Sequence, residues 1–161
     1  MDAKSQTEGS REIVNAYYQA GKESRLTDFA PLVADDFTTT APNYLPWGGT
    51  HLGGSFFRDQ VLPNLPDVLD FSRFSYDVLL AEGEKVVALI DVGVAGTGDV
   101  VKISEHWTVR DGQARSIWVA YFEPQPRPNS PPGPRGGVVR PKCRGRLRPA
   151  ADLTFAAGST D

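Results

Sequence analysis

The sequence predicts an α+β fold in which N-terminal helices pack on one face of a curved sheet. Apolar residues recur at helical spacing in residues 10–21 and 26–33. Apolar and polar residues then alternate through residues 71–80, 85–95 and 100–122, as they do in strands with one buried face. Helices followed by a run of strands favour an α+β arrangement, here with an antiparallel meander.

Helices are expected in three places. The first begins near Ser10, a candidate N-cap, and the polar residues 1–10 before it are expected to be disordered. A second helix is expected at residues 26–33. A third is expected at residues 55–62, where Ser55 offers an N-cap.

A loop rich in proline and glycine is expected between the second and third helices. It spans residues 41–54, follows a short strand at residues 37–40, and holds Tyr44, Trp47 and His51. Aromatic side chains in such a loop suggest either the rim of a binding pocket or a plug at one end of the core.

The last predicted hairpin, residues 100–122, places one carboxylic acid in an apolar row. Its strands are joined by Asp111 and Gly112, a strong hairpin signal. Because strand side chains alternate, Glu105 shares a face with four apolar residues of its strand, Val101, Ile103, Trp107 and Val109. A carboxylate on such a face is unfavourable unless it is paired, hydrogen-bonded or protonated. Glu105 is therefore the first candidate for a functional residue.

Charge and proline content divide the chain into two parts. Residues 1–124 carry ten Lys and Arg against eighteen Asp and Glu, which argues against nucleic acid as a partner. Residues 125–161 carry seven against two, and eight of the thirteen prolines lie in residues 124–149. We expect one folded domain at residues 11–124 and a disordered tail at residues 125–161.

The cysteine and histidine content limits which disulfides and metal sites the chain can form. Cys143 is the only cysteine, so neither a disulfide nor a cysteine-based zinc site is expected. The two histidines have no ligand-like spacing, so no metal is expected. No apolar stretch has the length of a signal-peptide core or a membrane span. We expect a soluble, cytoplasmic protein with no membrane partner and no cofactor.

Residues 11–124 resemble the SnoaL-like polyketide cyclases and ketosteroid isomerases, which belong to the nuclear transport factor two-like superfamily. The resemblance rests on three segments in order, IVNAYYQAGKESRLTDFAPLVADDFTTTAP, LPWGGTHLGG and EHWTVRDGQARSIWVAYFE. It implies a cone-shaped, strongly curved antiparallel sheet around three helices, a deep apolar pocket, and assembly as a homodimer.

The resemblance also implies roles for single residues. In ketosteroid isomerases, a helix tyrosine and a strand carboxylic acid donate hydrogen bonds to a developing enolate oxygen. Tyr17 matches the tyrosine, with Tyr18 at the margin of the buried face, and Glu105 matches the acid. The aspartate that serves as base in those isomerases matches Ala41, so the usual steroid isomerisation is not expected.

Four residues are candidate catalytic groups. Glu105 is the acid or base, Tyr17 is the oxyanion donor, and His106 or Asp91 is the second base. Strict alternation places His106 on the face opposite Glu105 and Asp91 at an interface, so structural roles for both stay open. Tyr121 would line the pocket only if the strand register slips by one residue. The expected substrate contacts are Tyr44, Trp47, Phe57, Ile90, Val92, Trp107, Trp118 and Phe122.

The sequence thus predicts a cofactor-free cyclase or isomerase of the SnoaL-like type. Its substrate would be a hydrophobic polyketide or aromatic secondary metabolite, transformed by acid/base chemistry. The alternative is a non-catalytic domain of the same fold that binds a small molecule or another protein, which Ala41 favours. A weaker alternative is a hydratase or epoxide-opening hydrolase that uses Asp91 together with Glu105. The expected partners are a small hydrophobic molecule and a second copy of the chain.

Overall fold

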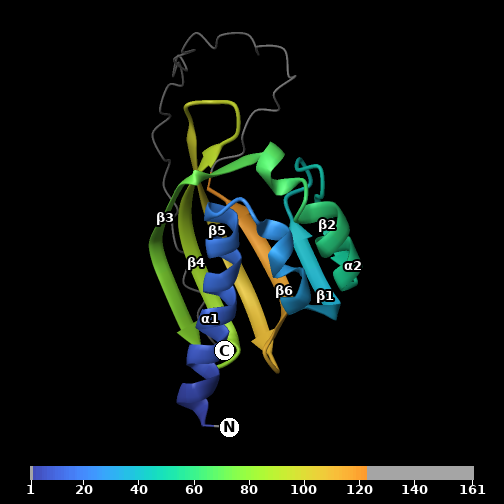
Figure 1. The fold of residues 1–161 in the computed structure, drawn as a ribbon, viewed down its shortest axis with the longest axis vertical. Coiled ribbons are helices and arrows are strands. Elements are labelled where there is room, and N and C mark those ends of the chain that lie inside the picture. The colour runs from blue at the N-terminus through green and yellow to red at the C-terminus, as the bar shows by residue number, and fades with distance from the viewer. Residues whose placement is uncertain (1, 123–161) are drawn as a thin grey trace, which may run out of the picture. The chain divides into compact units, whose positions relative to one another are not determined.

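The α+β class is confirmed by the computed structural model, which describes residues 2–122 (Figure 1). Residues 125–161, the predicted tail, lie outside the described residues. The helical segments are α1 (Ala3–Lys22), the 3₁₀ helices η1 (Leu26–Leu32) and η3 (Leu65–Asp67), the short α2 (Gly54–Phe56) and the π-helix η2 (Phe57–Val61). The strands are β1 (Val33–Ala41), β2 (Gly49–Leu52), β3 (Leu69–Glu82), β4 (Lys85–Val94), β5 (Val100–Arg110) and β6 (Gln113–Tyr121).

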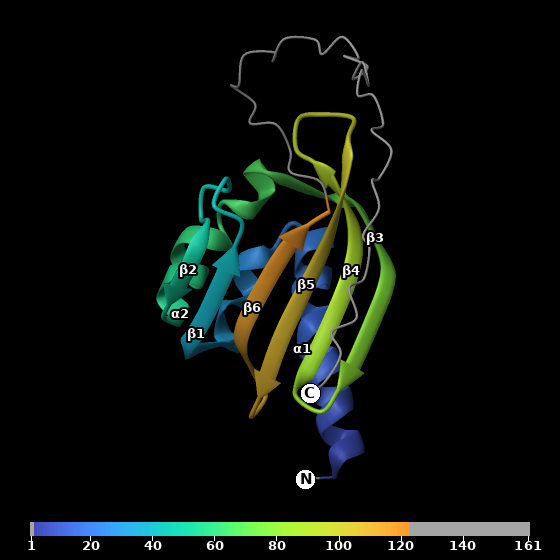
Figure 2. The same ribbon diagram turned by 180° about the vertical axis from the view of Figure 1, so that it is seen from behind.

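The six strands form one curved sheet with the order β2-β1-β6-β5-β4-β3. The helical segments lie on one face, and the opposite view shows the strands uncovered (Figure 2). The pairing is antiparallel except between β1 and β6, which are parallel. The curved antiparallel sheet is confirmed apart from this one pair, whose strands are far apart in the sequence. Register shifts interrupt three of the ladders and favour bending of the sheet.

The first helix begins earlier than the sequence predicts. Residues 1–10 were expected to be disordered, with Ser10 as the N-cap, but α1 begins at Ala3. Its early turns are bound to the β3–β4 turn: the Ser10 hydroxyl donates to the carbonyl of Gly83 (2.7 Å), and the Gly83 amide donates to the Thr7 hydroxyl (2.9 Å). These tertiary contacts stabilise the helical state of residues 3–10, a polar segment whose local helix propensity does not predict a helix. No helix within residues 2–122 is long and apolar enough to cross a membrane.

The second and third predicted helices are short and irregular. The segment before β1 is a 3₁₀ helix that buries Leu26 and Phe29 and contains Pro31, which cannot donate a backbone hydrogen bond. The third segment makes one α turn and continues as a π-helix. Gly54 lies so close to β1 that a Cβ atom there would collide with the carbonyl oxygen of Ala34. Close packing on β1 therefore fixes the position of this segment.

The predicted hairpin is confirmed. β5 and β6 are joined by Asp111 and Gly112, whose φ angles are 54° and 72°. Positive φ at both turn positions matches the right-handed twist of the flanking strands. The hairpin holds Glu105 and Trp107 on the inner face of the sheet, where the functional site is centred.

Candidate functional site

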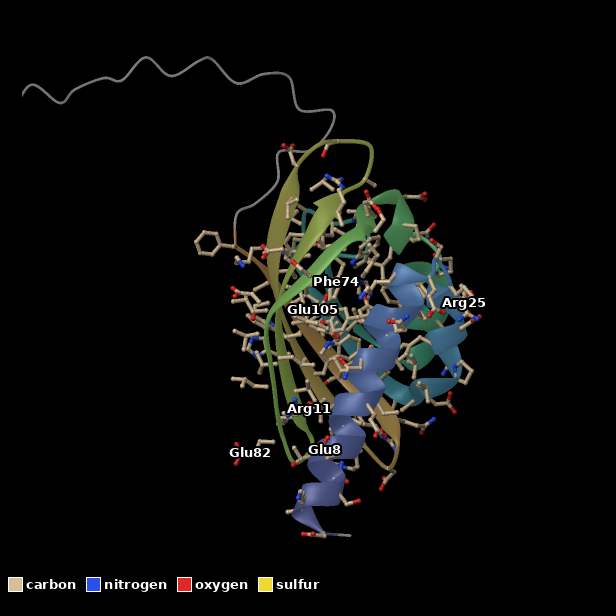
Figure 3. All side chains as sticks on the ribbon, turned by 60° about the vertical axis from the view of Figure 1, so that its left-hand side comes forward. Glu8, Arg11, Arg25, Phe74, Glu82 and Glu105 are labelled. Carbon is tan, nitrogen blue, oxygen red and sulfur yellow. The ribbon has the colours of Figure 1, made fainter. Side chains whose placement is uncertain are left out.

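Glu105 lies inside the fold, between the sheet and α1 (Figure 3). Its side chain is only 4% exposed. The Tyr18 hydroxyl donates a hydrogen bond of 2.5 Å to Oε2 of Glu105, and the indole Nε1 of Trp107 donates to the same oxygen at 3.3 Å. Alternation along β5 correctly predicted the inward orientation of this carboxyl.

Burial raises the pKa of Glu105 from its ordinary value of 4.5 to about 7. The hydrogen bonds from Tyr18 and Trp107 favour the ionised form and lower the pKa in part. A pKa raised toward neutrality suits a group that both takes and gives a proton. Both donors bind the same oxygen of Glu105, Oε2.

The tyrosine bonded to Glu105 is Tyr18, not Tyr17. The sequence placed Tyr18 at the margin, but its side chain is 1% exposed. Its ring stacks on Phe74 at 5.0 Å between centroids and meets Tyr76 edge-on at 5.3 Å. The curved sheet covers a wide arc of α1, so both consecutive tyrosines are buried. The Tyr18 ring packs against β3.

Tyr17 packs edge-on against Tyr18, with 5.0 Å between ring centroids, and lines a small cavity. Its ring lies 4.9 Å from Trp107 and 5.4 Å from Phe29, centroid to centroid. Burial and the charge of Glu105 raise its pKa well above the ordinary value. Tyr17 and Glu105 both line the cavity, so the phenol stays a candidate donor to a guest oxygen held near Glu105.

The cavity has a volume of about 20 Å³. Its polar lining comes from Tyr17, Thr39, Glu105 and Tyr121, and its apolar lining from Ala41, Leu45, Trp47, Phe57, Val61, Leu65, Leu69, Ile117 and Val119. This volume has room for one water molecule, whereas pockets for organic ligands measure roughly 300–1,000 Å³. The resemblance implies a deep pocket, but the cavity in this structure is small. A larger guest can enter only if the side chains that line the cavity move.

Tyr121 lines the cavity, and Trp118 and Phe122 do not. Trp118 is 49% exposed and Phe122 is 79% exposed, so neither side chain forms part of the cavity wall for which the sequence predicted it. A bulge shifts the β5–β6 register: Thr108 pairs with Ser116, but Val109 pairs with Ala114. The extra residue turns the odd-numbered side chains of β6 inward. Since β6 is apolar on both faces, its pattern could not decide between the two registers.

His106 and Asp91 lie on the outer face of the sheet, away from Glu105. Nε2 of His106 is 3.0 Å from the Ser104 hydroxyl, and Asp91 binds Nζ of Lys102 at 3.0 Å. Alternation correctly predicted this orientation, and it excludes both residues from the cavity as second bases. Within residues 2–122, no group of three or more His, Cys, Asp or Glu could hold a metal ion.

The other residues that the sequence predicts to contact a substrate divide into two groups. Trp47 and Phe57 line the cavity, and Trp107 adjoins it through its bond to Glu105. The remaining three do not line it: Ile90 and Val92 are buried in the core, and Tyr44 meets Tyr121 edge-on at 6.0 Å between centroids.

Substitution Tyr18→Phe is expected to raise the pKa of Glu105 by about one pH unit, because the carboxylate loses its shorter hydrogen bond. A ¹³C NMR titration of the Glu105 carboxyl measures this value. Tyr17→Phe is the matched control: it removes a phenol of the same helix that makes no hydrogen bond to Glu105, and the pKa is expected to change much less. Equal changes in the two variants would contradict the assignment of Tyr18.

Comparisons with known proteins support the fold. No protein-family description and no curated protein sequence matches the chain. Among solved structures, an NTF2-like protein from Burkholderia xenovorans LB400 is 21% identical, with a TM-score of 0.56 over 71% of this chain and 90% of its own. A "putative ketosteroid isomerase" from Kribbella flavida DSM 17836 is 17% identical, with a TM-score of 0.58 over 84% and 90%.

A de novo designed protein with a curved β-sheet is similar to the same degree. It is 19% identical, with a TM-score of 0.58 over 70% of this chain and 84% of its own. A designed chain can adopt this architecture, so the similarity alone does not establish an activity. The described chain has the α+β fold of the NTF2-like and ketosteroid isomerase-like proteins.

Proposed function

We propose that this protein binds a hydrophobic ketone and catalyses its enolisation, as the first step of an isomerisation or a cyclisation. The proposal rests chiefly on the position of Glu105, a buried carboxylic acid in the lining of a largely apolar cavity, where burial raises its pKa to about 7. The aromatic rings of Trp47 and Phe57 in the same wall suit a flat substrate such as an aromatic or polyketide metabolite. In this respect, the protein would act as a SnoaL-like enzyme.

In the proposed reaction, Glu105 moves the proton in both directions. Its ionised carboxylate takes a proton from the carbon beside the ketone, and the electrons of that C–H bond form the enolate. The Tyr17 hydroxyl donates a hydrogen bond to the enolate oxygen and stabilises its charge. Glu105 then returns the proton to a different carbon. In a cyclisation, the enolate carbon instead attacks a second carbonyl, and the oxygen of that carbonyl takes the proton from Glu105. Because one residue serves as acid and base, Ala41 does not prevent this reaction.

The test is proton exchange at the α-carbon of 2-tetralone, a small bicyclic ketone, followed by ¹H NMR in D₂O. The protein is expected to accelerate this exchange above the rate in buffer, with a rise through about pH 7 as Glu105 ionises. Binding of 2-tetralone without accelerated exchange would contradict the catalytic proposal.

The second candidate function is binding without chemistry. Two observations favour it: within residues 2–122, Glu105 is the only carboxylic acid that lines the cavity, and the cavity is small. In that case, 2-tetralone or a related ketone binds and its α-protons exchange at the buffer rate. The hydratase that would use Asp91 together with Glu105 is not proposed, because the two carboxyls lie on opposite faces of the sheet.

We also propose that the outer face of the sheet binds a second copy of the chain. This face carries exposed apolar side chains: Val78 and Leu80 on β3, Trp118 on β6, and Phe122 directly after β6. Large apolar side chains exposed on one face of a sheet favour association with another protein surface.

Substitution Leu80→Lys is expected to weaken the dimer at least tenfold, because a charge would be buried against the partner. Analytical ultracentrifugation measures the dissociation constant. Leu52→Lys places the same charge on β2, at the opposite edge of the sheet, and is the control. A wild-type chain that is monomeric at all concentrations would contradict the proposal.

A further inference from the structure

Thr39 carries a buried hydroxyl that has no hydrogen-bond partner. Within residues 2–122, three polar or charged residues are buried: Ser10, Thr39 and Glu105. Ser10 binds the carbonyl of Gly83, and Glu105 binds Tyr18 and Trp107. Thr39 is 2% exposed, and its Oγ1 atom has no partner in the described part of the chain. Buried hydroxyls are normally hydrogen-bonded, so this exception requires an explanation.

The local structure does not explain the hydroxyl. Thr39 lies on β1 between Phe37 and Ala41, and all three side chains are buried on the inner face. A β-branched residue suits a strand at this position, but valine offers the same shape without a polar atom. A buried hydroxyl without a protein partner that lines a cavity is a candidate contact for a bound molecule.

Thr39 adds a second polar group to the cavity lining, at a distance from Glu105. Thr39 lines the same cavity as Glu105, Tyr17 and Tyr121. It belongs to β1, and β6 lies between β1 and β5, so the backbones carrying Thr39 and Glu105 are two strand spacings apart, about 10 Å. A guest whose ketone is held near Glu105 extends its other side across β6 toward Thr39.

We propose that Thr39 is a specificity-determining residue that hydrogen-bonds a second oxygen of the ligand. The preferred ligand is then a hydrophobic molecule with two oxygen functions on different carbons, such as a hydroxyketone or a diketone. A threonine hydroxyl both donates and accepts, so the second oxygen is a hydroxyl or a carbonyl. This inference rests on the proposed function, because it presumes that the first oxygen is bound near Glu105.

The first experiment needs no ligand. Thr39→Val replaces the hydroxyl by a methyl group of similar size, and the ligand-free protein is expected to show an equal or higher melting temperature. Thr39→Ser keeps the hydroxyl and is expected to be less stable, because it loses the methyl group. A clear fall in the melting temperature of Thr39→Val would mean that the hydroxyl makes a structural bond, to protein or to a buried water, and would overturn the proposal.

The second experiment measures binding of 2-naphthol and of a series of dihydroxynaphthalenes by fluorescence titration. The wild-type protein is expected to bind at least one diol about tenfold more tightly than 2-naphthol, the gain of about one hydrogen bond. Thr39→Val is expected to lose this preference and to keep its affinity for 2-naphthol, and Thr39→Ser is expected to retain the preference.

The outcomes separate this inference from the proposed function. If 2-naphthol binds the wild type, but Thr39→Val binds every diol as the wild type does, the role of Thr39 is overturned and the binding of a hydrophobic ligand stands. If neither 2-naphthol nor any diol binds, both proposals fail. A diol preference that disappears only in Thr39→Val supports the inference.

Discussion

Glu105→Gln is expected to lower the protein-catalysed exchange of the α-protons of 2-tetralone by at least about 100-fold, the usual contribution of a positioned acid or base. Glutamine has nearly the same shape as glutamate, and its amide oxygen can still accept bonds from Tyr18 and Trp107. It cannot take a proton from carbon. The remaining activity is expected to show no rise through pH 7, and the affinity for 2-tetralone is expected to change little. A fully active variant would contradict the role of Glu105.

Glu105→Gln is also expected to change how the free energy of unfolding depends on pH. The same unfolding measurement shows whether the variant is folded. The pKa of Glu105 is raised from 4.5 to about 7 in the folded protein, so the folded state holds this proton more tightly than the unfolded state. The resulting stabilisation is complete below pH 4.5 and is lost as the pH rises to about 7. Its full size is ~3 kcal/mol. Urea unfolding should therefore show Glu105→Gln gaining stability relative to the wild type between pH 5 and pH 8.

Trp107→Ala is expected to destabilise the protein by about 3–5 kcal/mol, the usual loss for a large buried aromatic residue. Trp107 is 1% exposed, and its ring contacts four other aromatic rings, those of Tyr17, Phe29, Phe37 and Phe57. The variant also removes the indole donor to Glu105. Denaturant unfolding measures the change in the free energy of unfolding.

Trp118→Ala is the matched control for this prediction. It removes the same side chain from the neighbouring strand, where Trp118 is 49% exposed on the outer face. In the monomer, the expected loss is below about 1 kcal/mol, because little buried surface is removed. Similar losses for the two variants would contradict the register of β6 described above.

Residues 105 and 111–112 illustrate what local sequence patterns determine. Alternation along β5 places Glu105 inward and His106 outward, and the turn residues Asp111 and Gly112 fix the hairpin. Both features depend only on the two-residue period of a strand and on the backbone freedom of a turn. The fold class follows from the same patterns.

Residues 18, 118 and 121 illustrate what these patterns leave open. β6 is apolar on both faces, so one bulged residue decides whether Trp118 or Tyr121 meets the cavity. Tyr17 and Tyr18 are adjacent on α1, and the curved sheet buries both side chains. Only the packing of α1 against the sheet decides that Tyr18 makes the hydrogen bond to Glu105.

The sequence by itself determined the fold class, the hairpin and the buried position of one carboxylic acid, because each depends on the period of a single segment. Only the tertiary structure decided which tyrosine binds Glu105, that Thr39 faces the cavity without a partner, and how narrow that cavity is. These features depend on how separate segments pack and register against one another, and no single segment of the chain encodes that packing.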